Sequence, residues 1–458
     1  VSALTTDQVT KLTTTQLAVL ANSNVAALST AQVDALSTAQ LTSLNTSQVQ
    51  ALTAAVVASL STDKVQALTT TQVKALSADQ MGALTTTEAS SLTVTQVKVL
   101  GADQIRALTT SSVAALTTGQ VQALTTTQVS GLISSTVASF TTDQVQALTT
   151  AQVKVLADSV ITGLSTTQLT SLDTSQVAAL TASQIRALNT TEVNALTTTQ
   201  IGGLTTSQIA SLENADMVAM TADQVGALNT SQVAALTVGM VANLSTDQVT
   251  ALGTTNVTAL TDVQVKALTT ASVAALGTDQ VGVLTTSQVT ALTAAAVGAL
   301  STDQIGALTT SQVKVLTTAN VVALSTAQVA ALSTDQVSAL TTAQVHAIAT
   351  DDVQALTTSA IAALSSSQLQ SLSNVAVAAL TTDQVAALTT SQVPKLTTSE
   401  VASLTTSQVV ALNTDQVQSL QVSQLVAMSD AQVNALTTTQ IGALTNTQLL
   451  GLVTAAKP

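Results

Sequence analysis

Residues 4–12 read Leu-Thr-Thr-Asp-Gln-Val-Thr-Lys-Leu, and a close variant of this stretch recurs every eight residues along the chain. One position of each octet holds a large apolar residue, from Leu4 to Leu452 without a slip, which makes 57 repeats. A second apolar slot lies five residues after each first slot, beginning at Val9. Strict internal periodicity of this kind is typical of repeat architectures. We therefore expect residues 1–458 to form one continuous array without a linker.

A period of eight fits neither long regular element. On one continuous helix each repeat would rotate the leucine slot by about 80°, so the leucines would wander around the whole cylinder. On one strand Leu4 and Val9 would face opposite sides of the sheet, because they are five residues apart. The chain must therefore turn within every repeat.

The polar residues indicate how the chain turns. Thr5 and Gln8 have the spacing of a capping box, in which the N-cap threonine and the N3 glutamine satisfy each other's backbone N–H groups. Leu4 and Val9 then form the hydrophobic staple around this helix start, and Asp7 lies in the first turn, where the helix dipole favours a carboxylate. Each octet thus predicts a helix of about six residues. Because so short a helix is unstable alone, we predict an all-α solenoid of stacked helices.

A second, longer period appears in the glutamine slot. Residues other than glutamine occupy it at steps of 24 or 32 residues: Asn24, Val56, Glu88, Ser112, Thr136, Val160, Glu192, Asp216, Met240, Ser272, Ala296, Asn320, Asp352, Ala376 and Glu400. Lys64, Asn256 and Ala360 fall outside this spacing. The mean step predicts about 3.4 repeats per superhelical turn, with one side of the turn not requiring glutamine. A β-solenoid remains the alternative fold, since threonine and valine favour strands.

Composition excludes several classes of function. The net charge of -13 disfavours binding to nucleic acid and to anionic membrane surfaces. No apolar run approaches the ~18 residues of a membrane span. The chain has no cysteine, so disulfides and thiolate metal sites are excluded.

No group of residues predicts a catalytic, cofactor or metal site, and we expect the protein not to be an enzyme. His346 is the one histidine and lies in the variable slot after the second apolar residue, so a surface position is expected. Asp351 and Asp352 are adjacent, but calcium needs more oxygen ligands. Pro394 falls at N5 of its helix and removes one backbone hydrogen bond, which predicts a weak point. At the C-terminus Lys457 occupies a position where an apolar residue is due.

Units such as LTTDQVAAL (residues 380–388) and LSTAQVAAL (residues 324–332) resemble the octapeptide tracts of very large bacterial surface proteins of the adhesin-like, haemagglutinin-like and RTX-like kinds. The resemblance implies secretion and a cell-surface location. The glycine- and aspartate-rich nonapeptides that bind calcium in RTX proteins are absent from the sequence, so calcium binding is not carried over.

The unbroken register predicts a structural role as an extracellular rod, stalk or filament, formed by self-assembly or serving as the spacer of a giant adhesin. Neither end of the array shows a polar cap, so we expect the ends to pair with other copies or with flanking domains. The alternative is a binding surface for ice, a glycan or another protein, built from the repeated threonines.

Overall fold

A computed structural model describes residues 1–455 of the chain, which form two units that divide between Leu228 and Asn229. Both units consist of very short helices joined by tight turns, and residues 1–455 contain no strand. The all-α class is confirmed, and the β-solenoid alternative is wrong.

The helices follow the octet period. An α-helix begins at every eighth residue from α1 (Thr6–Thr10) to α55 (Asn446–Ala455), with two departures at α32 (Gly253–Ala259) and at the 3₁₀ helix η1 (Val393–Lys395). Apart from α32 and α55, each α-helix has four to six residues. The four-residue helices are α7 (Ala54–Val57), α20 (Asp158–Ile161), α44 (Thr350–Val353) and α46 (Ser366–Leu369).

Helix α38 (Thr302–Ala307) shows how one repeat is built. Ser301 is its N-cap, with an extended backbone at φ −71° and ψ 165°, and its hydroxyl accepts the N–H of Gln304. The Gln304 side chain completes the predicted capping box. Leu308 returns to an extended conformation, at φ −62° and ψ 134°, and so ends the helix. Two extended residues per octet, the leucine and the cap, reverse the chain before the next helix begins.

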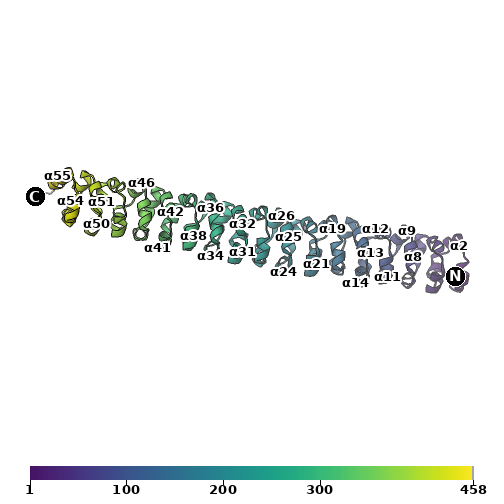
Figure 1. Ribbon diagram of the computed structural model, residues 1–458. Helices are drawn as coiled ribbons and strands as arrows, with labels where there is room; N and C mark the ends of the chain where they lie inside the picture. The colour runs from purple at the N-terminus through teal and green to yellow at the C-terminus, as the bar shows by residue number, and fades with distance from the viewer. Residues whose placement is uncertain (456–458) are drawn as a thin grey trace. The chain divides into compact units, whose positions relative to one another are not determined.

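Within each unit, helices stack on the third helix after them. In the first unit α9 (Thr70–Ala75) packs on α12 (Val94–Val99), which packs on α15 (Thr118–Ala123). In the second unit α33 (Asp262–Ala267) packs in the same way on α36 (Thr286–Ala291) and then α39 (Thr310–Val315). Figure 1 shows these short coils following one another within each unit. The chain of each unit is therefore wound into a superhelix.

The two apolar slots form the core of each unit. Val145 is fully buried and Leu148 is 4% exposed, and the same pattern holds in nearly every repeat. Each such side chain contributes about 1.5–3 kcal/mol on burial. The N-cap, N1 and N2 positions and the variable slot lie mainly on the outside, as Thr285, Thr286, Ser287 and Thr290 do. The hydrophobic effect therefore acts between turns rather than within any one helix.

Two repeats depart from the common geometry. Gly253 adopts a positive φ of 68°, and Leu252 before it stays helical, so that α31 (Thr246–Ala251) leads directly into α32. Pro394 lies in η1, where a 3₁₀ turn replaces the expected α-helix because proline has no N–H to donate.

Candidate functional site

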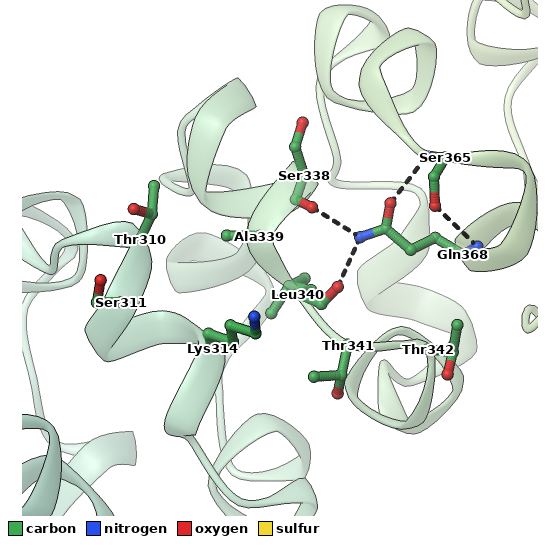
Figure 2. Close-up of a pocket in the computed structure, with 10 residues that line it drawn as sticks. All are labelled: Thr310, Ser311, Lys314, Ser338, Ala339, Leu340, Thr341, Thr342, Ser365 and Gln368. Carbon is green, nitrogen blue, oxygen red and sulfur yellow. Dashed lines mark hydrogen bonds between the residues drawn. The ribbon is translucent and has the colours of Figure 1, made fainter.

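The repeated functional group of this fold is the buried glutamine at N3. Gln368 on α46 illustrates it (Figure 2): its Oε1 accepts the N–H of Ser365 at 2.7 Å, and its own N–H donates to the Ser365 hydroxyl at 3.2 Å. Its Nε2 then donates to the carbonyls of Val337, Ser338 and Leu340 at 3.1, 3.1 and 2.7 Å. One side chain thus caps its own helix and binds the preceding turn of the superhelix.

The contact follows one register along both units. Gln48 donates to the carbonyls of Leu17 and Leu20, which lie 31 and 28 residues earlier, at 2.8 Å each. Gln416 reaches Val385 and Leu388 with the same offsets, at 3.1 and 2.6 Å. Since 28 to 31 residues lie between three and four octets, each superhelical turn spans between three and four repeats. This agrees with the 3.4 repeats per turn expected from the sequence.

The first repeats show that the contact needs a preceding turn. Gln8 and Gln16 lie fewer than 28 residues from Val1, and both are exposed. Gln32 is the first glutamine of the series to be buried, and its Nε2 donates to the carbonyl of Leu4 at 2.7 Å. Burial of the amide therefore comes from winding and not from the local helix.

Repeats without glutamine lie on one another. In the first unit α11 (Thr86–Ser91), α14 (Thr110–Ala114), α17 (Ser134–Ala138) and α20 pack in succession, and all four lack glutamine at N3. In the second unit the same holds for α34 (Thr270–Ala274), α37 (Ala294–Gly298) and α40 (Thr318–Val322). The repeats that the sequence pattern set apart therefore share one stack within each of these stretches.

Some replacements preserve the bond between turns. The Ser112 hydroxyl donates to the Leu84 carbonyl at 2.9 Å, and Asn320 Nδ2 donates to the Leu292 carbonyl at 3.2 Å, both with the offset of 28 residues. Lys64 is buried in the glutamine slot and donates to the Asp34 carbonyl. Its ammonium also forms an ion pair with the Asp34 carboxylate at 2.8 Å. The carbonyls of the turn below thus attract any donor of suitable length.

Acidic residues in the slot cannot make this contact when ionised. Glu88, Glu192 and Glu400 keep the capping box, each accepting the N–H of its own N-cap residue. Burial raises the pKa of Glu400 above its ordinary value, although hydrogen bonds from Thr397 offset part of the effect. Burial likewise raises the pKa of Asp216, which occupies the slot in α27 (Asn214–Ala219).

The surface hollows are shallow, and polar and apolar groups line them in similar measure. The hollow in Figure 2 has a volume of about 510 Å³, and hydroxyls of Thr310, Ser311 and Thr342 line it together with Lys314. Another, of about 570 Å³, gathers the exposed cations Lys74, Lys98 and Arg106. Arg106 pairs with Asp103 at 3.3 Å.

The residues singled out from the sequence lie apart. His346 is exposed in the variable slot, and its Nδ1 hydrogen-bonds with the Ser371 carbonyl at 2.7 Å. Asp352 is buried and accepts the Thr326 hydroxyl at 2.7 Å, whereas Asp351 is exposed. Across residues 1–455 no three histidine or acidic side chains gather as metal ligands. Lys457 lies outside the described residues.

Comparison with known protein families identifies the repeat. Eleven segments match the ALTTAQ repeat family: residues 20–62, 55–86, 97–134, 183–214, 209–246, 263–294, 290–318, 316–348, 345–374, 367–398 and 419–446. The chain belongs to the ALTTAQ repeat family. The six letters of the ALTTAQ repeat stand unaltered at residues 339–344, where Leu340 precedes the cap, Thr341 is the N-cap and Gln344 is the buried amide. No curated protein matches the chain.

The ALTTAQ geometry continues where the family match does not. Gln152 lies between matched segments, yet its Nε2 donates to the carbonyls of Val121 and Leu124 at 3.1 and 2.6 Å. Among the helices of residues 1–455, none has the length and apolar character needed to cross a membrane.

Proposed function

We propose that this ALTTAQ repeat scaffold serves as an extracellular rod, stalk or filament with a structural and non-catalytic role. The observation that carries the proposal is the glutamine contact between turns. The backbone carbonyls of each turn accept hydrogen bonds from the glutamine amides of the next turn. Each turn can therefore bind a further turn of the same sequence. Adding octets lengthens such a structure without any change in its cross-section.

The direction of the contacts suits a load-bearing spacer. The Nε2 bonds join one turn to the next, so a pull along the axis of a unit acts on three or four links per turn together. Each neutral hydrogen bond contributes about 0.5–1.5 kcal/mol, and buried leucine and valine side chains add to every layer. The outer surface is mostly hydroxyl and small apolar groups, and acidic residues exceed basic ones by 24 to 11.

Negative-stain microscopy of the purified chain tests the structural proposal. Elongated particles one superhelix wide are expected, and a chain with additional octets should be longer by a fixed increment per octet. Compact particles whose length does not grow with repeat number would contradict a spacer role. Treatment of intact source cells with a protease tests the extracellular location, because a surface stalk is cleaved while cytoplasmic proteins stay whole.

Partners of the rod follow from the same proposal. Other copies of the chain, or flanking domains of a longer polypeptide, are the expected partners, and the adhesin-like resemblance supports the second arrangement. A light-scattering series over protein concentration separates the two, because self-assembly raises the average mass with concentration and a spacer within one polypeptide does not.

The alternative is a binding surface formed by the outer threonines. Exposed hydroxyls at the cap and N1 positions, such as those of Thr285 and Thr286, recur in every turn and support this reading. A turn of 3.4 repeats rotates the hydroxyls around the axis, which does not favour one flat ice-binding face. A thermal-hysteresis assay tests ice binding directly, and a glycan array tests the carbohydrate version.

A further inference from the structure

Glu400 carries a buried oxygen that lacks a partner. The residue is 2% exposed on α49 (Thr398–Ser403). Its Oε2 accepts the N–H of Thr397 at 2.6 Å, as a capping glutamine would. Its Oε1 occupies the end of the side chain where glutamine has Nε2. Within residues 1–455 it is the one buried side-chain oxygen or nitrogen without a hydrogen bond.

The register of the neighbouring repeats shows what this oxygen faces. Gln392 donates to Ile361 and Leu364, at 3.0 and 2.7 Å, and Gln408 donates to Val377 and Leu380, also at 3.0 and 2.7 Å. These are the carbonyls 31 and 28 residues before each glutamine.

The same offsets from Glu400 point to the carbonyls of Leu369 and Leu372. The Leu369 carbonyl already accepts the Leu372 N–H at 3.1 Å. In the described part of the chain no hydrogen bond reaches the Leu372 carbonyl. If Glu400 keeps the register of the neighbouring glutamines, its Oε1 and the Leu372 carbonyl are two acceptors directed at one another, and they attract each other only when a hydrogen or a cation lies between them.

The spacing of the neighbouring links favours a hydrogen. Their donor–acceptor separations of 2.7–3.0 Å are those of ordinary hydrogen bonds. A calcium ion would need about 2.3–2.6 Å to each oxygen and some six to eight oxygen ligands. Glu400 and two carbonyls supply too few oxygen ligands for calcium.

We propose that Glu400 is a proton-operated joint between two turns of the solenoid. In the protonated state Oε1–H donates to the Leu372 carbonyl and closes the link that glutamine makes in other repeats. In the ionised state two acceptors oppose each other and the link opens. This pH-dependent contact lies between two turns of the second unit, and it goes beyond the proposed structural role.

The surroundings of Glu400 do little to stabilise a carboxylate. The helices that pack on α49 are α47 (Asn374–Ala379) and α52 (Val422–Val426), and neither carries a titratable residue. Helix α46, which bears Leu369, carries none either. Lys395 on the adjacent η1 is exposed and makes no ion pair with Glu400. Burial accordingly raises the Glu400 pKa above its ordinary 4.5.

Because the pKa of Glu400 is raised, its contribution to stability should fall as the pH rises. A carboxyl that is harder to ionise in the folded state stabilises the fold fully at a pH below its unfolded pKa. This stabilisation is lost as the pH rises through the higher folded pKa. The turns joined at Glu400 should thus be tightest in acid and looser near neutrality. The neighbouring repeat is irregular too, since Pro394 converts it to η1, so loosening is concentrated in one place.

Hydrogen exchange of the full chain over about pH 4–8 tests the joint. The measurement compares wild type with Glu400→Gln, which restores the common repeat, and reads the protection of amides in residues 397–404. Equal protection is expected at the acid end. Towards neutrality wild type should lose protection relative to Glu400→Gln by about tenfold for each unit by which the pKa is raised.

A second variant places a glutamate at N3 of the following repeat. Gln408→Glu should acquire the same falling profile in residues 405–412. Infrared spectra of wild type at intermediate pH should show a carboxylic-acid C=O stretch that Glu400→Gln lacks. Parallel pH profiles in wild type and Glu400→Gln would overturn the proposal. Recovery of protection near neutrality on adding calcium, reversed by a chelator, would also overturn it and assign the slot to a cation.

Discussion

The contact between turns can be tested at Gln144, which is 1% exposed. Its Oε1 accepts the Thr141 N–H at 2.8 Å, and its Nε2 donates to the carbonyls of Val113, Ala114 and Leu116 at 2.9, 3.2 and 2.6 Å. Gln144→Met keeps the length and volume of the side chain but removes its polar atoms. The substitution therefore isolates the hydrogen bonds from the packing.

The expected cost follows from the groups left behind. The Val113 carbonyl still accepts the Leu116 N–H at 3.2 Å, so it keeps a partner. The Thr141 N–H and the carbonyls of Ala114 and Leu116 lose theirs. Thr141 and Ala114 are exposed, so water can replace the lost bonds there, whereas Leu116 is buried. A buried backbone group without a partner costs about 1–3 kcal/mol, so Gln144→Met should cost about 1–3 kcal/mol. In a solenoid this cost falls on the local turns and not on the whole array.

Hydrogen exchange measures this local cost. Amides in residues 113–148 should exchange at least roughly fivefold faster, which corresponds to about 1 kcal/mol. Gln146→Met is the matched control, since Gln146 lies exposed in the variable slot of the same repeat. It should change exchange by less than a factor of two or three. If both variants behave alike, the buried amide does not hold the turns together and the reasoning fails.

Further substitutions test the irregular and core positions. Gly253→Ala should cost about 1–2 kcal/mol in urea unfolding, because φ is 68° there, whereas Gly277→Ala at φ −67° should stay within about 0.5 kcal/mol. Ile305→Ala empties a fully buried position and should cost about 2–5 kcal/mol, lowering the Tm seen by calorimetry. Pro394→Ala should convert η1 to an α-helix and increase the protection of nearby amides. Asp216→Asn should stabilise the fold near neutral pH in thermal melts, and its advantage should vanish below the ordinary Asp pKa of 3.8, since burial raises that pKa.

The local structure of each repeat was predictable because it depends on residues close in sequence. The spacing of Thr5 and Gln8 predicts a capping box. The structure confirms it, with the Gln8 N–H donating to Thr5 Oγ1 at 3.3 Å. The strand propensity of threonine suggested the wrong alternative. The structure explains the ambiguity, because the N-cap threonine does adopt an extended backbone, at φ −74° and ψ 163° for Thr5, although no strand forms in residues 1–455.

The second role of the glutamine was not predicted. From the sequence Gln368 appeared to be a capping residue alone, since the cap explains only its Oε1. Nothing in one octet shows that Nε2 meets a carbonyl 28 residues earlier, as it does at Leu340. The one available signal was the spacing of non-glutamine residues at steps of 24 or 32 residues. It predicted the approximate length of a turn but not which atoms are in contact.

The sequence by itself determined one capped helix per octet and the two buried apolar slots, and it predicted a turn of about 3.4 repeats. These follow from short-range rules, since a cap, a staple and a hydrophobic spacing all act within one or two octets. Only the tertiary structure decided which carbonyls the buried amides meet, and that Glu400 Oε1 is buried without a hydrogen bond. The physical reason is that a hydrogen bond requires an ångström-level match between atoms, and winding alone brings residues about 28 positions apart to that distance.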